Sequence, residues 1–416
     1  MALQVDYFPP IIVPAKNPVV FHISADPGDP LKENHKIGLQ VFKTGADGDE
    51  QIFEDLVSVY YANNRAIAVF EISELLLPSL KSYFQLYTQA GWNAKIDRTE
   101  MILPFYVKYY EQFGSPASPS TLKTSNWFYA LNGGVPSWKR SSFYSVYDNF
   151  CKYVISQKKQ FLTWRNNAKV TDINATEKLY FLVPEDPAKI NYILKVTRHY
   201  FDDGDEEENI DIGHSMLVGK VYELDVSYKS VIESYLGNFS GYSVQVLSAD
   251  ELYFGEIFEF RMDFRSYPNA RYFVFLNSLG AFEGIRFTGE GIKDIALSRQ
   301  FYDKGSLQLY SSSTASRGQT NPIVTLGFKV NTGWITNQEL EYLQDFLISP
   351  EIFEIKDGIR IPAMIKNDKF ELQKDNNFLN SLTIEMEYLD FSNVYQRDTD
   401  NAWQDVEAVE PPYNEA

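Results

Sequence analysis

Two histidines flank the most acidic run of the chain, where side chains suited to metal binding gather in the sequence. His199 precedes and His214 follows residues 202–208, Asp-Asp-Gly-Asp-Glu-Glu-Glu. A hairpin would bring both imidazoles together, and imidazoles with carboxylates can bind a metal ion. The run does not match an EF-hand loop, because Glu208 stands where that loop needs glycine. We favour a solvated acidic loop over loose Ca²⁺ or Mg²⁺ binding, and we predict no metal site.

The sequence offers no convincing phosphate cradle or nucleophile. Residues 289–294, Gly-Glu-Gly-Ile-Lys-Asp, lack the third glycine of a dinucleotide-binding loop, and Asn132-Gly133-Gly134 precedes Pro136, so we interpret both as turns. Gly-x-Ser-x-Gly does not occur. The single cysteine, Cys151, lies on the apolar face of a predicted helix, which favours a packed thiol. We predict no catalytic residue and no cofactor.

Carboxylates and aromatic side chains keep two sugar-related functions as alternatives, glycoside hydrolysis and carbohydrate binding. A glycoside hydrolase needs only two carboxylates placed by the fold, and 56 acidic residues make their presence uninformative. Trp127, Tyr129 and Trp138 could stack on sugar rings, although core or subunit-contact roles are the favoured interpretation. We therefore expect a protein that is not an enzyme, with a carbohydrate- or receptor-binding protein as the alternative and a glycoside hydrolase or depolymerase third.

The composition narrows the class of protein. The 416 residues carry 38 basic and 56 acidic side chains, a formal net charge of −18, which argues against duplex nucleic acid as a partner. One cysteine excludes an intrachain disulfide. No apolar stretch reaches 18 residues and the N-terminus lacks a signal-peptide pattern, so we expect no membrane insertion and assembly in the cytoplasm.

Short β-prone runs separated by turn residues dominate the first predicted domain, residues 1–172. The predicted strands are 19–23, 37–42, 52–61, 66–72, 101–110 and 161–164, with one helical turn at 75–80. Phe143, Tyr147, Phe150 and Val154 recur at helical spacing and predict a helix over 142–156.

Two further β-rich domains follow in our interpretation. Residues 173–265 contain predicted strands at 179–183, 190–200, 216–228 and 254–264, with 202–208 as an acidic hairpin loop. Residues 266–395 contain strands at 272–276, 285–288, 323–330 and 382–388, and a helix at 337–348 that opens with the capping box Thr336-Asn337-Gln338-Glu339. Residues 396–416 form an acidic tail that we expect to be mobile. The predicted fold is mainly β with a few helices, in two to three β-sandwich-like domains.

Several segments, in order along the chain, resemble a family of tail-associated proteins of phages and prophages of Bacteroidetes. They are Ala15-Lys16-Asn17-Pro18-Val19-Val20-Phe21, Phe161-Leu162-Thr163-Trp164, Leu179-Tyr180-Phe181-Leu182-Val183-Pro184, residues 275–283 (Phe-Leu-Asn-Ser-Leu-Gly-Ala-Phe-Glu), Phe287-Thr288-Gly289, Gly333-Trp334, residues 347–352 (Leu-Ile-Ser-Pro-Glu-Ile) and Ile361-Pro362-Ala363. The resemblance covers most of residues 1–395. It implies a virion tail as the setting and carries over no catalytic residue.

This resemblance leads us to expect a structural virion protein, a ring-forming component of a baseplate or tail tip. Its expected partners are copies of itself and other phage tail proteins. A host-surface glycan is the further partner under the receptor-binding alternative. An aromatic-rich chain can supply the apolar contact surfaces that such a ring requires.

Overall fold

The computed structural model describes most of the chain as a set of β-sheets. The described residues are 3–28, 31–45, 48–84, 96–135, 161–165, 167–183, 192–201, 204–212, 219–232, 239–248, 254–303, 317–320, 323–370 and 379–389. The predicted helix at 142–156 and the predicted tail at 396–416 lie outside these ranges. The predicted fold class, mainly β with a few helices, is confirmed.

The N-terminal unit is a β-sandwich. Its strands are β1 (Gln4–Tyr7), β2 (Ile12–Pro14), β3 (Val20–Ala25), β4 (Lys36–Gly45), β5 (Gly48–Ser58), β6 (Tyr60–Ala62), β7 (Arg65–Glu71), β9 (Ile102–Phe113), β10 (Ser118–Pro119), β11 (Lys123–Thr124) and β12 (Phe128–Leu131). One sheet has the order β1-β3-β7-β6; the other has the order β2-β12-β9-β4-β5, with β10 and β11 also paired to β9. Phe21 and Ile23 of the first sheet share one core with Phe105 and Val107 of the second. Short helical turns follow the strands at α1 (Ser73–Leu76), η1 (Leu77–Ser79) and η2 (Thr99–Met101).

The second unit is also a sandwich. Its elements are β8 (Ile96–Asp97), β13 (Ala168–Thr171), β14 (Lys178–Leu182), β15 (Tyr192–Tyr200), β16 (Asp205–Asp211), β17 (Val221–Asp225), α4 (Tyr228–Val231), β18 (Phe239–Ser248) and β19 (Phe254–Met262). A sheet of order β13-β19-β18-β15-β16 packs on a sheet of order β14-β17-β8. The strands β8 and β13 fall within the predicted domain 1–172, yet both pair here, β8 with β17 and β13 with β19.

The third unit is a single large sheet with one helix on it. Its elements are β20 (Arg271–Leu276), β21 (Phe282–Phe287), β22 (Ile292–Ser298), β23 (Phe301–Asp303), β24 (Arg317–Gln319), β25 (Ile323–Asn331), β26 (Ile335–Thr336), α5 (Asn337–Leu347), β27 (Ile352–Lys356), β28 (Ile359–Ile365), β29 (Leu379–Asn380) and β30 (Thr383–Tyr388). The sheet order is β21-β20-β27-β28-β30-β25-β22; β23 pairs with β24, and β26 with β29.

The predicted capping box of α5 is present, since the Glu339 amide donates to the Thr336 hydroxyl at 3.3 Å and the Thr336 amide donates to the Glu339 carboxylate at 2.8 Å. Leu340, Leu343 and Phe346 of α5 then cover Phe273 and Phe328 of the sheet.

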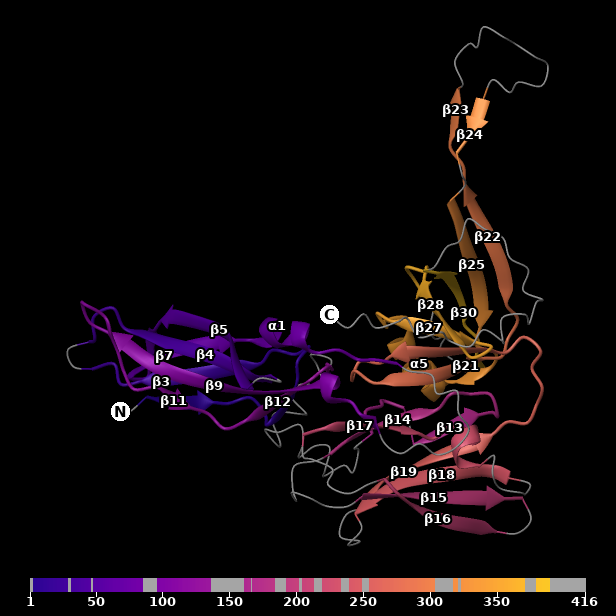
Figure 1. Cartoon of the computed structure of the whole chain (residues 1–416), viewed down its shortest axis with the longest axis horizontal. Coiled ribbons are helices and arrows are strands. Elements are labelled where there is room, and N and C mark those ends of the chain that lie inside the picture. The colour runs from indigo at the N-terminus through magenta and orange to yellow at the C-terminus, as the bar shows by residue number, and fades with distance from the viewer. Residues whose placement is uncertain are drawn as a thin grey trace, which may run out of the picture.

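The second and third units stack as layers (Figure 1). The sheet containing β15 and β18 lies at the bottom of the figure, the sheet with β14 and β17 above it, and then the β20–β27 sheet with α5. The N-terminal sandwich extends from one side of this stack. Successive side chains of β20 point to opposite faces of the sheet. Phe273 and Phe275 therefore face α5, while Val274 and Leu276 face the β14-β17-β8 sheet below. Within the described ranges, no helix is long and apolar enough to cross a bilayer.

Two local predictions are wrong. Asp205 to Glu208 do not form a loop, because they begin β16, antiparallel to β15. The reason is charge pairing across the strands: Lys195 Nζ lies 2.6 Å from the Glu207 carboxylate, and Arg198 pairs with Glu208. Residues 161–164 do not form a strand; Phe161 makes only an isolated bridge to Phe181.

Candidate functional site

A buried apolar cluster, which we call the joint, connects all three units. It combines side chains from the N-terminal sandwich, from the β14-β17-β8 sheet and from β20 and β21, including Ile12, Met101, Leu131, Tyr180, Leu182, Val221, Val274, Leu276 and Phe282. Phe84 packs against Phe282 and Phe353, with ring centroids 5.6 and 6.4 Å apart. Because no unit covers this surface by itself, burial here fixes the units against one another.

The turn between β20 and β21 inserts into the N-terminal sandwich. The Gly134 amide donates to the Ser278 carbonyl at 2.7 Å, and the Ser82 hydroxyl donates to the Gly280 carbonyl at 2.6 Å. Gly280 has φ = +87°, and a Cβ there would lie 1.7 Å from the Asn132 carbonyl oxygen. Only glycine combines this backbone conformation with so close an approach.

Charged side chains in the joint are buried and paired. The Glu223 carboxylate accepts from Arg98 Nε at 2.8 Å and from Lys178 Nζ at 2.5 Å, which holds the chain at the end of β8 against the β14-β17-β8 sheet. Burial lowers the pKa of Lys178, and the neighbouring Glu223 opposes this shift. A buried ion pair adds little stability over an apolar pair, but removing one partner leaves an uncompensated charge.

Asp345 of α5 supports the inserted turn from the other side. Its carboxylate accepts from the Ser278 amide at 3.1 Å and from the Ser278 hydroxyl. Burial raises the Asp345 pKa to about 6; the Ser278 hydrogen bonds and Lys16 lower it, and Glu283 raises it. The group therefore holds the turn in place rather than serving an open cavity.

Segments that carry the sequence resemblance meet at the joint. The Lys16 amide donates to the Gly133 carbonyl at 2.9 Å, and the Asn17 side chain exchanges two 2.7 Å hydrogen bonds with the backbone of Val135. Asn277 donates to the Leu162 carbonyl at 2.8 Å. The Lys16 and Asn17 bonds hold the 133–135 segment of the N-terminal unit, and the Asn277 bond joins the third unit to the Leu162 segment.

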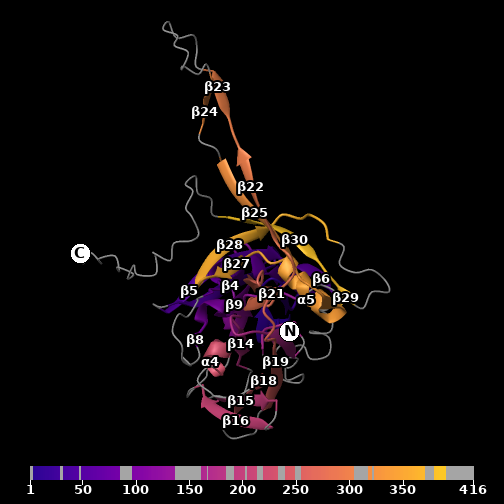
Figure 2. The same ribbon diagram turned by 90° about the vertical axis from the view of Figure 1, so that its right-hand side faces the viewer.

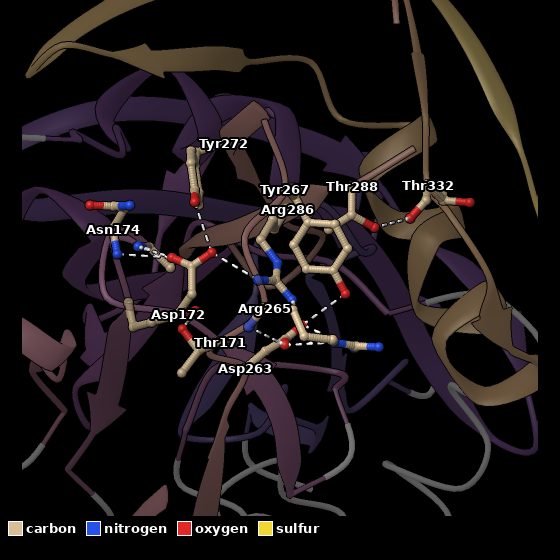
Figure 3. Close-up of polar contacts among 12 residues, drawn as sticks. Thr171, Asp172, Asn174, Asp263, Arg265, Tyr267, Tyr272, Arg286, Thr288 and Thr332 are labelled. Carbon is tan, nitrogen blue, oxygen red and sulfur yellow. Dashed lines mark hydrogen bonds and ion pairs between the residues drawn. The ribbon is translucent and has the colours of Figure 1, made fainter. Parts of the chain in front are cut away.

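A network of carboxylates and guanidinium groups joins the second and third units (Figure 3). Arg286 bridges two carboxylates, at 2.8 Å to Asp172 and 2.9 Å to Asp263. The Tyr272 hydroxyl donates to Asp172 at 2.7 Å, and Arg265 Nε donates to Asp263 at 2.9 Å. The Arg265 and Arg286 hydrogen bonds hold the Asp263 pKa well below its ordinary value, while burial raises the pKa of Tyr272 to about 12. Asp263 is thus a permanent anion between two cations.

This network forms one wall of a cleft of about 810 Å³ between β13, the end of β21 and α5. Its charged lining is mainly basic, with Asp263 and Glu339 as acids and Arg165, Lys169, Arg261, Arg265 and Arg286 as bases. Arg165 stacks on the Tyr342 ring at 3.9 Å, and its buried Nε has no hydrogen-bond partner among the described residues. Burial lowers the pKa of Lys169 to about 8. Trp334 lines the cleft and is 76% exposed. The cleft therefore offers cations and an aromatic face to a ligand.

A long β-hairpin leaves the third unit, and we call its described residues 292–303, 317–320 and 323–327 the arm. It consists of β22, β23, β24 and the outer half of β25, and Figure 2 shows it rising away from the sheets. Every residue of β22 and β23 is exposed. Ile295, Leu297 and Phe301 are 63%, 47% and 64% exposed. The arm is thus an apolar surface with no cover in the described part of the chain.

The structure does not gather the predicted chemical residues into one site. His199 contacts Asp205 at 2.8 Å and Ser243 at 3.3 Å, whereas His214, Cys151 and Trp138 lie outside the described ranges. Among the residues with described positions, no group of three or more His, Cys, Asp or Glu could hold a metal ion. The Gly289 segment is the bend between β21 and β22, as predicted.

Of the three aromatic residues weighed for sugar stacking, the two with described positions, Trp127 and Tyr129, lie in the N-terminal unit. Trp127 meets the Tyr106 ring edge-on at 4.7 Å, and Tyr129 packs against the joint. The arm and the cleft were not predicted. Trp334 lay within a motif segment, but its exposure had no signal in the sequence.

No family model and no curated protein matches the chain. Among solved structures, a chain described as "Marsupial T cell receptor" matches with a TM-score of 0.18 and 8% sequence identity, over 79% of this chain and 96% of that chain. A similarity of this size supports no conclusion about fold or function.

Proposed function

We propose that the protein is a structural component of a phage tail that forms a ring in the baseplate or tail tip. The observation that carries the proposal is the arm. A monomeric soluble protein rarely exposes a contiguous apolar surface of this kind, and such surfaces typically mark protein–protein contacts. Ile295, Leu297 and Leu326 would become buried when copies of the chain or other tail proteins assemble on it.

The joint supports the same role. Packing of Met101 and Ile102 with Leu182 and Val221 fixes the N-terminal unit to the second unit, and the turn at 277–281 fixes it to the third. A ring subunit has to present its contact surfaces at fixed angles, because a closed assembly tolerates little variation between neighbours. The sequence resemblance supports a virion setting, with assembly in the host cytoplasm before particles form.

Self-association of the purified full chain tests this proposal. Native mass spectrometry at rising protein concentration should show a discrete oligomer. Ile295→Glu in the arm should reduce the oligomer more than about tenfold, since it places a charge in an apolar contact. Ile257→Glu is the matched control, because Ile257 is 54% exposed on the outer face of β19. A wild-type chain that stays monomeric at every concentration and is absent from virions by mass spectrometry would contradict the proposal.

The cleft favours a second candidate function, binding of an acidic saccharide from a host surface. Trp334 provides a stacking face, and Arg165, whose buried Nε has no hydrogen-bond partner among the described residues, provides a donor for a carboxylate or sulfate. A glycan array should show binding by the wild type that Trp334→Ala abolishes and the control Trp127→Ala retains. Equal binding by all three proteins, or none by the wild type, would refute it. The proposed role is non-enzymatic, so new reducing ends in a polysaccharide digest would contradict it.

A further inference from the structure

The apolar side of the arm continues the core face of the third sheet. The register pairs Lys293 with Phe328, Ile295 with Leu326, and Leu297 with Val324, so these side chains point the same way. Phe328 lies under α5 and is 1% exposed. Two residues earlier in β25, toward the tip of the arm, helix α5 no longer covers the strand, and Leu326 is exposed. The arm is therefore a strip of core-type surface that its own chain leaves bare.

A second surface with exposed apolar and aromatic side chains lies on the N-terminal sandwich, on the outer side of the β1-β3-β7-β6 sheet, beside the Asp6–Arg65 ion pair. Tyr7 pairs with His22 and His22 with Val69, and Ile67 pairs with Tyr60 in a neighbouring row. The alternate residues of β3 and β7 point inward to the core, so these five face outward. Tyr60 and Val69 are 52% and 40% exposed. We call this surface the aromatic face.

The two surfaces belong to one chain but do not meet within it. Figure 1 shows β3 and β7 at the left end of the molecule and β22 and β25 projecting upward from the top of the stack. An arm that projects in this direction cannot fold back onto its own N-terminal sandwich. A second copy can bring an aromatic face to it.

Charge favours a second copy as the occupant. Residues 292–327 contain four basic and two acidic side chains, whereas the rest of the chain contains 34 basic and 54 acidic ones. The arm is thus a net cation attached to a strongly acidic body. Copies that meet arm to body attract, while copies that meet body to body repel each other.

We propose that the arm of one copy lies across the aromatic face of the next copy, with Ile295 and Leu297 against Val69 and Tyr60. The arm and the aromatic face are different surfaces of the chain, so the contact between copies is heterologous. Such a contact repeats from copy to copy until a ring closes. This inference rests on the proposed ring function and names the surface that the arm occupies.

Directed cross-linking tests the contact. Cys151 is the only cysteine, so Cys151→Ser gives a background without thiols. Leu297→Cys in one protein should form disulfide dimers with Val69→Cys in another, more than about tenfold faster than with the control Ile257→Cys, because docking raises the effective concentration. Equal rates with Val69→Cys and Ile257→Cys would overturn the contact. Thermal melts of each variant show that folding is unchanged.

Mixing two assembly-deficient variants gives a second readout. Leu297→Glu loses the arm surface and Val69→Glu loses the aromatic face, so each alone should be monomeric by native mass spectrometry. Mixed together they retain one intact arm and one intact face, and should form a dimer containing one copy of each. If the wild type forms a ring but the mixture stays monomeric, the docking surface is wrong and the ring function stands. If the wild type is itself monomeric, both fail.

Discussion

The joint and the arm use the same kinds of side chain for opposite purposes. Strand β25 shows the contrast within one element, because it runs from the core beneath α5, on the opposite face of the sheet from the joint, out into the arm. Phe328 and Val330 at one end of this strand are each 1% exposed beneath α5, whereas Ile323 at the other end is 57% exposed. Apolar residues of β25 lie on both sides of the point where α5 ends. The two parts of the strand differ only in whether the helix covers them. Apolar residues in the joint stabilise the fold of one chain, and apolar residues in the arm are available to another chain.

An ion-pair deletion separates the two regions most strongly. Glu223→Ala should lower the free energy of unfolding by about 3 to 5 kcal/mol, because Arg98 and Lys178 would remain as buried charges without their counterion. The matched change in the arm is Asp303→Ala, which removes the partner of Arg317 from an exposed pair at 2.9 Å. Urea denaturation of both variants measures the difference. Similar losses in the two proteins would show that the joint is not the more tightly coupled region.

A phenylalanine truncation compares packing in the same two places. Phe282→Ala in the joint should cost about 3 kcal/mol through a cavity beside Phe84 and Phe353, since Phe282 is 1% exposed. Phe301→Ala in the arm should change stability by less than about 0.5 kcal/mol and weaken self-association instead. Calorimetry and native mass spectrometry report the two effects. A destabilised Phe301→Ala monomer would mean that the arm packs on its own chain.

The joint also predicts a pH dependence. The Asp345 pKa is raised to about 6, so the folded chain holds this proton more tightly than the unfolded chain does. Stability contributed by the protonated form is present at low pH and is lost as pH rises from about 4 to 6, by up to about 3 kcal/mol. Asp345→Asn should remove this slope in pH-dependent denaturation. Asp294→Asn on the exposed strand β22 is the control, and an unchanged slope in Asp345→Asn would disprove the assignment.

The smallest effect is expected at the helix that separates covered from uncovered strand. Thr336→Ala should lower stability by about 1 kcal/mol, because it removes the side-chain half of the capping box on α5. Thr325→Ala on β25 has no cap to remove and serves as the comparison. Equal thermal shifts in the two variants would indicate that the capping box contributes nothing.

The sequence was sufficient where one element decides its own structure. The Thr336 capping box predicted α5, and alternation of Leu382, Ile384 and Met386 predicted β30. The acidic start of β16 was missed because its counterions, Lys195 and Arg198, lie on the partner strand. Carboxylate-rich runs are ordinarily solvated loops, and only the pairing register shows otherwise.

The joint and the arm escaped prediction for different reasons. Arg98 and Glu223 are 125 residues apart, so no local pattern connects them. Ile292, Ile295 and Leu297 on β22 follow neither a strict two-residue nor a helical period. An apolar pattern also predicts burial, and the exposure of the arm depends on where α5 ends.

Hydrogen exchange measured by mass spectrometry at low and high protein concentration tests the central claim most directly, because it reports both regions in one experiment. Amides of residues 292–303 and 323–327 in the arm should gain protection as concentration rises, together with those of β3 and β7. Amides of residues 273–283 in the joint should be equally protected at both concentrations. An arm whose exchange does not respond to concentration, or a joint that becomes protected only at high concentration, would contradict the division between folding and assembly surfaces.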